Sequence, residues 1–196
     1  MQLPHPFRQA IPDDAVALAE LVNMAGEGLP FHLWSRTAAP GEDPWDIGRA
    51  RALRESVSFS YRNAIVVEDA GRVVAGLVGY RQPDVPEPID YAKMPPMFVG
   101  LQELENLAPK TWYVNVLATY PQARGKGWGT RLLALAEDLA RDSGASGLSI
   151  IVADSNQGAR RLYERTGYRE TATRKAVKEG WKSPIENWVL LVKPLR

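Results

Sequence analysis

The segment Trp112–Arg131, WYVNVLATYPQARGKGWGTR, decides the fold because it contains a strand, a glycine-rich loop and the start of a helix in succession. The strand is apolar up to Ala118, and the helix that follows carries a stripe at helical spacing, formed by Trp128, Leu132, Leu135, Ala136 and Leu139. Glycine tolerates the tight turns that aim several backbone N–H groups at one point. A helix N-terminus has unpaired N–H groups and a partial positive charge, so it attracts phosphate. The segment therefore predicts a loop that binds pyrophosphate, and Arg124 and Lys126 add positive charge beside it.

Two common nucleotide-binding motifs do not fit this loop. The dinucleotide fingerprint needs its third glycine five residues after the first, whereas Gly125, Gly127 and Gly129 stand at alternate positions. The phosphate loop of nucleotide triphosphatases needs Ser or Thr after its Gly-Lys pair, and Gly127 stands there instead. ATP or a dinucleotide is therefore a weaker hypothesis for the ligand.

Helical and strand patterns alternate along the rest of the chain. Asp13-Asp14 predicts the start of a helix that ends at Gly26, and its expected buried stripe is Val16, Leu18, Leu21, Val22 and Ala25. Asp43-Pro44 opens a second helix with an expected stripe of Ala50, Leu53, Val57 and Tyr61. The other predicted elements are strands at Ala64–Glu68, Val73–Tyr80, Thr111–Ala118, Gly147–Ala153, Arg169–Val177 and Asn187–Val192, and helices at Phe98–Leu107, Gly127–Ser143 and Asn156–Thr166.

Two connecting segments are ambiguous. We predict a loop at Glu27–Glu42, whose aromatic residues Phe31 and Trp34 either bind a ligand or cover the edge of the core. We interpret Gln82–Lys110 as an insertion in one domain of residues 1–196, because the pattern after it needs a sheet to join.

The composition excludes several classes of protein. The chain has 196 residues, 45% of them hydrophobic, which is enough for a core. With 24 basic and 23 acidic residues the net charge is +1, so we expect no nucleic-acid partner. The chain has no cysteine and two histidines, so we expect no metal site and no thiol catalysis. No apolar run reaches the length of a membrane span and Met1–Phe7 lacks a signal-peptide pattern, so we expect a cytoplasmic protein without a membrane partner.

The loop resembles the acyl-CoA loop of the GNAT superfamily of N-acyltransferases, because Arg124–Gly129 has the form Arg/Gln-x-x-Gly-x-Gly. A second block of that superfamily, Asn-x-x-Ala-x-x-Leu-Tyr followed by a Gly-aromatic pair, is similar to Asn156–Tyr163 and Gly167-Tyr168. The resemblance implies an α/β (α+β) fold with a mixed, mostly antiparallel, twisted sheet of about six or seven strands. It further implies helices on both faces of the sheet and strands that splay at the acyl-CoA site.

The resemblance also implies roles for individual residues. Acetyl-CoA would be the cosubstrate, with its pantetheine arm bound by main-chain atoms of Leu117, Ala118 and Thr119. Its pyrophosphate would be bound by Arg124, Gly125, Lys126, Gly127, Trp128, Gly129 and Thr130. Asn156 would bind near the thioester, and Tyr163 would be the general acid that protonates the departing thiolate. The alternatives are purely structural roles, a helix cap for Asn156 and packing for Tyr163.

The proton acceptor has no clear candidate in the sequence. Many relatives place a carboxylate on the strand before the phosphate loop, but that strand has none here, and Asn115 does not accept a proton. Glu27, Glu68, Glu103 and Asp154 are candidates by neighbourhood alone. The leading hypothesis is an enzyme that moves an acetyl group to a primary amine by direct attack, without a covalent enzyme intermediate. The missing carboxylate keeps open a non-catalytic acyl-CoA-binding or sensing module.

The acceptor amine is not specified by the sequence. In such folds the acceptor side is usually formed by the first helical region and the last hairpin, here about Glu27–Asp43 and Ala176–Pro184. The first carries acidic residues and the second carries lysines, so they favour opposite charges on the acceptor. The acceptor amine is either a small molecule or a peptide, and the sequence is compatible with both. The oligomeric state is open, and a homodimer is one option.

Overall fold

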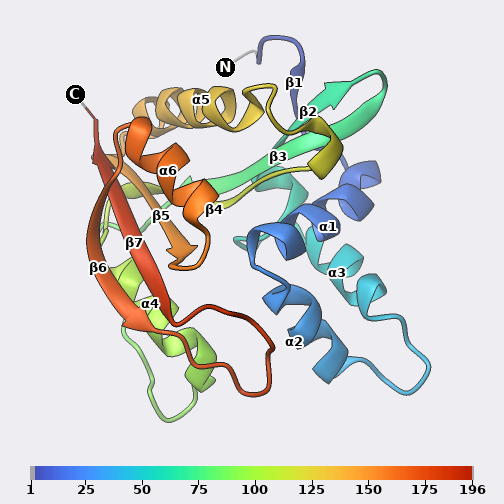
Figure 1. Ribbon diagram of the computed structural model, residues 1–196, viewed down its shortest axis with the longest axis vertical. Helices are drawn as coiled ribbons and strands as arrows, with labels where there is room; N and C mark the ends of the chain where they lie inside the picture. Colours follow the sequence, from blue (N-terminus) through green and yellow to red (C-terminus); the bar gives the residue numbers. More distant parts are fainter. Residues whose placement is uncertain (1–2, 196) are drawn as a thin grey trace. The chain divides into compact units, whose positions relative to one another are not determined.

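The computed structural model describes residues 3–195, which divide into two compact units. The first unit contains the chain up to Gly79 and Asn115–Leu132, and the second contains Tyr80–Val114 and the chain from Leu133. The strands form one seven-stranded mixed sheet in the order β1-β2-β3-β4-β5-β7-β6 (Figure 1). Strands β3 (Arg72–Arg81) and β4 (Thr111–Thr119) each run from one unit into the other.

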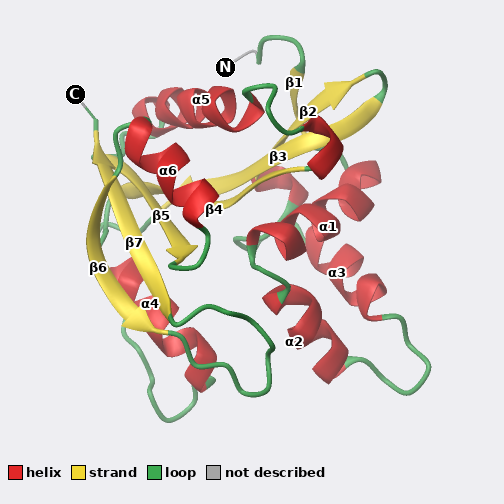
Figure 2. Cartoon of the chain, viewed as in Figure 1, coloured by secondary structure: helices red, strands yellow, loops and turns green. Residues whose placement is uncertain are grey.

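The first unit begins with β1 and a group of short helices (Figure 2). Its elements are β1 (Phe7–Gln9), α1 (Ala15–Ala25), α2 (Leu29–Thr37), α3 (Pro44–Ala52), β2 (Ala64–Asp69), and 3-10 turns at Pro12–Asp14, Tyr61–Asn63 and Pro121–Ala123. Strand β1 pairs antiparallel with β2, and β2 pairs antiparallel with β3. Helix α5 (Trp128–Asp142) starts in this unit and continues into the second.

Side-chain alternation in β2 gives the sheet of the first unit two covered faces. Ala64 and Val66 belong to a buried cluster with Leu18 of α1. Residues between them point to the other face, where Phe7 lies opposite Val67. On that face the Phe7 ring packs edge-on against Trp128 of α5, with 6.2 Å between the ring centroids. Helices therefore cover both faces of this part of the sheet.

The second unit contains the only parallel strand pair in the described part of the sheet. Its further elements are α4 (Pro96–Asn106), β5 (Gly147–Ala153), α6 (Gln157–Arg165), β6 (Arg169–Lys175) and β7 (Asn187–Pro194). Strand β5 pairs parallel with β4 from Thr111↔Gly147 to Val114↔Ile150, while β7 pairs antiparallel with both β5 and β6. Helix α4 packs against β5, β6 and β7, and a Cβ at Gly100 would lie 3.2 Å from the Cβ of Arg174.

The expected fold class is confirmed, since the sheet is mixed, mostly antiparallel and seven-stranded. The predicted splaying of the strands at an acyl-CoA site stays a prediction. Among the described residues, no helix combines the length and the apolar composition that crossing a bilayer requires.

Three sequence-based expectations about the helices are wrong. The segment Glu27–Glu42 is not a continuous loop, because α2 forms within it and Pro30 lies in the first helical turn, where its missing N–H costs no hydrogen bond. Val16 is 51% exposed, since α1 turns Ala15, Leu18, Ala19 and Leu21 inward instead. Helix α3 ends at Ala52, so Leu53 and Val57 lie beyond it and are exposed, and its buried residues are Gly48 and Ala52.

The structure also decides between the two interpretations of Trp34. Its side chain is 2% exposed and meets Trp45 at a centroid distance of 5.7 Å. The ring lies so close to α3 that a Cβ at Gly48 would stand 2.5 Å from it. Trp34 is therefore a core residue, and glycine at position 48 permits the close contact.

We predict that Gly48→Ala destabilises the protein by about 1–3 kcal/mol, because the rigid indole must shift to admit a methyl group. Chemical denaturation measures the free energy of unfolding. Gly158→Ala is the control, since its Cβ would meet only the Asn156 Oδ1 atom at 3.8 Å on the exposed side of α6. There alanine should be neutral or slightly stabilising. Equal stability of the Gly48→Ala variant and the wild type would contradict the packing of Trp34 on Gly48.

Candidate functional site

The loop between β4 and α5 is fixed at its first end by Tyr120. The Tyr120 N–H donates to the Val74 carbonyl at 3.0 Å, and its hydroxyl donates a short hydrogen bond to the Glu20 carboxylate. Burial, followed by this hydrogen bond, raises the pKa of Tyr120, so the hydroxyl stays protonated as a donor. Strand β4 therefore ends at a defined place, immediately before the glycine-rich loop.

Two glycines in this loop adopt backbone conformations that favour glycine. Gly125 has φ +77° and Gly127 has φ +81°, and an added Cβ at either position would meet no described group within 4 Å. Backbone conformation rather than lack of space is therefore what requires glycine here. The Arg131 N–H donates to the Gly127 carbonyl at 3.1 Å, which makes Gly127 the N-cap of α5. The N–H groups of Trp128, Gly129 and Thr130 consequently have no acceptor within the helix.

The other end of the loop is anchored by the first turn of α5. The Arg131 guanidinium lies over the Trp128 ring at 4.6 Å and over the Phe7 ring at 4.9 Å. The Trp128 side chain thus packs against Arg131 and Phe7. Only the backbone N–H of Trp128 is available to a ligand at the start of the helix. This arrangement fixes where the N-terminus of α5 is placed relative to β1.

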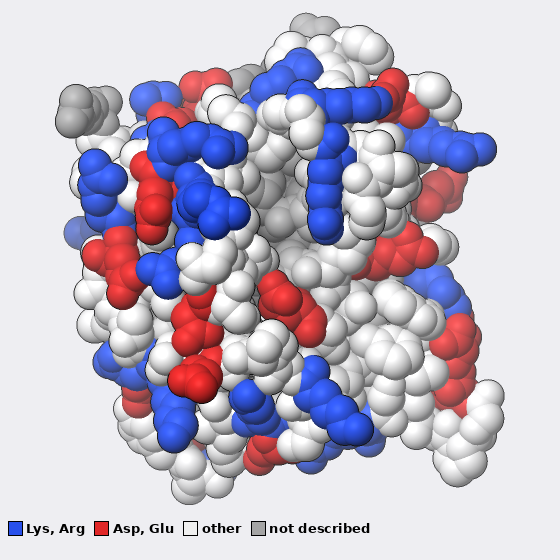
Figure 3. Space-filling view, viewed as in Figure 1, with Lys and Arg blue, Asp and Glu red and all other residues white. Residues whose placement is uncertain are grey.

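Two exposed cations stand beside this helix start. Lys126 Nζ lies 3.3 Å from the Asp69 carboxylate, and Arg124 Nε donates to the Thr119 carbonyl at 3.2 Å. An exposed ion pair contributes little stability, so Lys126 is available to exchange Asp69 for an anion, and the exposed Arg124 side chain is held by a single hydrogen bond to a carbonyl. Figure 3 shows basic and acidic side chains interspersed over the face it draws, with basic side chains around the loop that precedes α5 in Figure 1. The donors and charges present here fit a pyrophosphate group.

Asn156 and Tyr163 lie on α6 in the second unit. The Asn156 side chain accepts a hydrogen bond from the Ala159 N–H at 3.0 Å, so it is the N-cap of α6 as one of its two interpretations predicted. Tyr163 follows seven residues later, two helical turns away and on the same side of the helix. The structure thus brings Leu117–Thr119 and Arg124–Thr130 together in the first unit, and Asn156 and Tyr163 together in the second.

Tyr163 is 5% exposed, and its ring centroid lies 5.9 Å from that of Tyr168. Burial raises the pKa of the Tyr163 hydroxyl, which keeps the group protonated at neutral pH. A protonated hydroxyl is able to donate a proton to a developing anion. The geometry is thus compatible with an acid, although packing alone would give the same burial.

A group of residues that the sequence did not single out lies where α4 meets the start of β4. Glu105 of α4 accepts a hydrogen bond from the Gln82 side chain at 3.0 Å. The buried Tyr113 of β4 packs edge-on against Tyr80, with ring centroids 5.7 Å apart. One signal for Glu105 is present in the sequence, because it directly follows Leu104, which stands two helical turns after Met97, and these two are the buried residues of α4.

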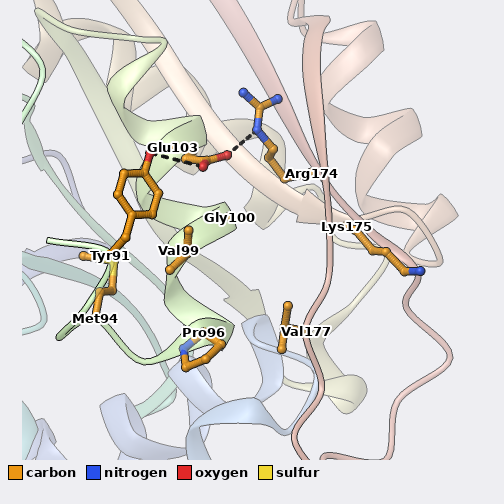
Figure 4. Close-up of a pocket in the computed structure, with 9 residues that line it drawn as sticks. All are labelled: Tyr91, Met94, Pro96, Val99, Gly100, Glu103, Arg174, Lys175 and Val177. Carbon is orange, nitrogen blue, oxygen red and sulfur yellow. Dashed lines mark hydrogen bonds and ion pairs between the residues drawn. The ribbon is translucent and has the colours of Figure 1, made fainter. Parts of the chain in front are cut away.

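A separate open cavity of about 390 Å³ lies between α4 and the end of β6 (Figure 4). Glu103 and Arg174 form an ion pair at 2.5 Å at this cavity, and the Tyr91 hydroxyl donates to Glu103 at 3.4 Å. Its other lining residues are Met94, Pro96, Val99, Gly100, Lys175 and Val177. Of the residues considered from the sequence, Glu103 was a candidate proton acceptor, and Val177 belongs to the segment expected on the acceptor side.

Comparisons with known proteins point to one family. The family model described as Acetyltransferase (GNAT) family matches residues 31–168, which is more than half of the chain. In Bacillus subtilis (strain 168), the uncharacterized N-acetyltransferase YhfO is 40% identical over 78 residues, covering 37% of this chain and 52% of that protein. The uncharacterized N-acetyltransferase YycN of the same organism is 46% identical over 59 residues, covering 30% of this chain and 38% of that protein. The match thus spans about half, or less, of the length of these relatives.

Solved structures support the fold at low sequence identity. The crystal structure of an acetyltransferase has a TM-score of 0.66 at 22% identity and covers 97% of this chain and 99% of that chain. An N-acetyltransferase from Staphylococcus aureus Mu50 has a TM-score of 0.63 at 19% identity, covering 95% and 98% of the two chains. These likenesses concern the fold. The family model, which spans the glycine-rich loop and α6, shows that the chain belongs to the GNAT acetyltransferase family.

Proposed function

We propose that this chain transfers an acetyl group from acetyl-CoA to a primary amine by direct attack. The observation that carries the proposal is the start of α5, where three N–H groups without an intrahelical acceptor follow the cap Gly127 beside two exposed cations. Membership of the acetyltransferase family supports acetyl-CoA as the ligand of this loop. We further propose that residues 1–196 form one acetyltransferase domain with an insertion at 82–110, located in the cytoplasm.

Each part of the proposed site has a definite task. Main-chain atoms of Leu117, Ala118 and Thr119 bind the pantetheine arm, and Arg124–Thr130 binds the pyrophosphate. Asn156 keeps its helix cap and binds near the thioester. A strand-end N–H such as that of Ala118 stabilises the oxyanion that forms when the amine attacks the thioester carbonyl.

Tyr163 is the proposed acid. As the amine lone pair forms the new C–N bond and the C–S bond breaks, the Tyr163 hydroxyl gives its proton to the sulfur. Because burial raises its pKa, the Tyr163 hydroxyl is fully protonated at neutral pH before the thiolate departs. No covalent enzyme intermediate is needed, which agrees with a chain that has no cysteine.

We predict that acetyl-CoA and CoA stabilise the protein against thermal unfolding, while ATP and NADH do not. A ligand at one hundred times its Kd adds about 2.7 kcal/mol to the free energy of unfolding. That gain corresponds to a rise in Tm of several degrees. Unchanged melting with both CoA species at millimolar concentration would remove the acyl-CoA site, and equal shifts with ATP would favour a general nucleotide site.

Substitutions of two comparable glycines, one at each end of α5, test where CoA binds. Gly127 has φ +81° and Gly144 has φ +68°, and neither has a described group within 4 Å of an added Cβ. Alanine at either position should therefore cost about 1–2 kcal/mol of stability. Only Gly127→Ala should also reduce the Tm shift with CoA, because only it disturbs the donors at the helix start.

For catalysis, we predict that Tyr163→Phe lowers kcat by about 10²- to 10⁴-fold, the usual contribution of a general acid. A panel of small amines and peptides first identifies an acceptor. Steady-state kinetics with that acceptor then measure kcat. The Tm shift that acetyl-CoA causes in the Tyr163→Phe variant should stay at the wild-type value. Tyr168→Phe is the control, because this buried hydroxyl has no hydrogen-bond partner among the described residues, and its loss should leave kcat close to wild type. Wild-type kcat in Tyr163→Phe at all pH values would exclude Tyr163 as the acid.

A wild-type protein that binds acetyl-CoA and acetylates no amine in the panel would favour the non-catalytic acyl-CoA-binding module. Transfer to a single good acceptor would eliminate that alternative. Acetyl transfer to an amine therefore distinguishes the two functions, whereas binding of acetyl-CoA does not.

A further inference from the structure

The cavity between α4 and the end of β6 has the features of a small-molecule site that the proposed function does not use. Its volume of about 390 Å³ lies within the range of about 300–1,000 Å³ that such sites occupy. Its lining residues all belong to the second unit, and none of them lies in the glycine-rich loop or in α6. The cavity is therefore a candidate site for a second ligand.

Hydrogen bonds within the chain hold the wall of the cavity that carries Tyr91 and Met94. The side chain of Asn106, at the end of α4, accepts from the Glu87 N–H at 2.9 Å and donates to the Glu87 carbonyl at 2.8 Å. The Met94 N–H donates to the Asp90 carbonyl at 2.9 Å, which closes a turn around Tyr91. Because these bonds keep the wall in place, the site is preformed, and a preformed site reduces the ordering cost of binding.

One part of the cavity is apolar and accessible to a ligand. The side chains of Met94, Pro96, Val99 and Val177 form this part and lie below the ion pair in Figure 4. Val177 is 41% exposed, and Tyr91 at the same cavity is 65% exposed. An apolar group of a ligand would remove these surfaces from water, which favours binding. This part of the cavity therefore fits a hydrocarbon or aromatic side chain.

The polar end of the cavity offers both an acceptor and a donor. Glu103 Oε2 accepts from Arg174 Nε at 2.5 Å, whereas Glu103 Oε1 accepts from the Tyr91 hydroxyl at 3.4 Å, which is long for a hydrogen bond between oxygens. Arg174 Nη1 donates to the Thr173 carbonyl at 2.9 Å, and Arg174 Nη2 has no acceptor in the described part of the chain. The Lys175 side chain points away from this ion pair in Figure 4. A carboxylate oxygen and a guanidinium nitrogen are thus both available to a ligand.

The paired charges of Glu103 and Arg174 decide which head group fits the cavity. A ligand with only an ammonium group would meet Glu103 next to the repelling charge of Arg174. A ligand with only a carboxylate would meet Arg174 next to the repelling charge of Glu103. A zwitterion gives each side chain an opposite charge, and hydrogen bonds between charged groups are roughly twice as strong as neutral ones. The like-charge repulsion discriminates against the singly charged ligands.

We propose that this cavity binds a free amino acid with an apolar side chain. The α-ammonium group donates to Glu103 Oε1, the α-carboxylate accepts from Arg174 Nη2, and the side chain lies against Val99 and Val177. The proposal goes beyond the proposed function, because it concerns a ligand other than acetyl-CoA and involves no covalent step.

A series of related ligands, added to the ¹⁵N-labelled full chain, tests the proposal without any substitution. Leucine and phenylalanine should cause saturable shifts of the backbone amides of residues 99–103 and 174–177. Isopentylamine is leucine without its carboxylate, and isocaproate is leucine without its amine. Each should bind at least about 10-fold more weakly than leucine. Serine should also bind more weakly, because it lacks an apolar side chain, and so should leucine amide and N-acetyl-leucine, which stand for the two ends of a peptide.

Substitutions in the ion pair test the head-group contacts. Glu103→Gln and Arg174→Gln should each raise the Kd of leucine by about 10- to 100-fold, because each loses a hydrogen bond between charged groups. Glu103→Gln should at the same time bind isocaproate more tightly than the wild type does, since the repelling carboxylate is gone. Asp84→Asn is the control, because Asp84 forms an ion pair with Arg81 at the same distance of 2.5 Å and does not line the cavity.

A pair of exposed valines tests the apolar part. Val177→Ser should raise the Kd of leucine by about 3- to 10-fold, because methyl groups that the ligand would cover are lost. Val57→Ser is the control, since Val57 is 39% exposed in the first unit and should leave the Kd at the wild-type value. Circular dichroism checks that each variant is folded.

Three results would overturn the proposal. They are equal affinities for leucine, isopentylamine and isocaproate, shifts that fall outside the cavity, and no saturation by either amino acid at its solubility limit. A wild-type protein that binds leucine at this cavity and does not bind CoA would instead overturn the proposed function and leave the amino-acid site in place. The two failures are therefore distinguishable.

Discussion

The proposed site depends on the cap that Gly127 forms at the start of α5. Its left-handed φ allows the chain to pass from the loop into the helix while its carbonyl accepts the first helical hydrogen bond. An L-residue with a side chain would pay about 1–2 kcal/mol for the same conformation. Three N–H groups are thereby directed out of the helix end at one place, and two exposed cations stand next to them.

The surroundings hold that helix end in position. Tyr120 fastens the preceding strand through its N–H to β3 and through its hydroxyl to α1. Arg131 and Trp128 fasten the first helical turn to Phe7 of β1. Because these contacts lie on both sides of the loop, its N–H groups are preorganised rather than assembled when a ligand arrives, and preorganisation reduces the cost of binding.

The segment 82–110 gives the chain a helix whose two sides have different surroundings. The side of α4 with Gly100 and Glu103 meets β6, where the ion pair with Arg174 satisfies its carboxylate. The other side carries Glu105 to the start of β4, where a neutral amide is its hydrogen-bond donor. The same residue type thus has an ion-pair partner on one side of the helix and a neutral hydrogen-bond donor on the other.

Local patterns predicted most of the fold. The range Gly147–Ala153 agrees with β5, and Gly167 occupies the left-handed position after α6, with φ +97°. Periodicity and end signals act within a few residues, so they are legible in one sequence. Helix α2 was not predicted, because Gly28 and Pro30 suggest a loop unless the proline falls in the first turn. The packing of Trp34 on Gly48 also depends on contacts between helices.

The candidate site was predictable to the same extent. The glycine spacing and the Asn156–Tyr163 block are local, and they identified the loop and α6. The burial of Glu105 was not predicted, because it arises only when α4 and Gln82 come together in the folded chain. Burial of a polar group is a tertiary property, and one sequence gives little indication of it.

The central claim is that the donors at the start of α5 bind the pyrophosphate of CoA. Titration of CoA into ¹⁵N-labelled protein, followed by the backbone amide resonances, tests it residue by residue. The account predicts that the largest shifts fall on residues 125–130, with Trp128, Gly129 and Thr130 prominent among them, and that adenosine without phosphates leaves them in place. Tight CoA binding that leaves these amides unshifted would contradict it.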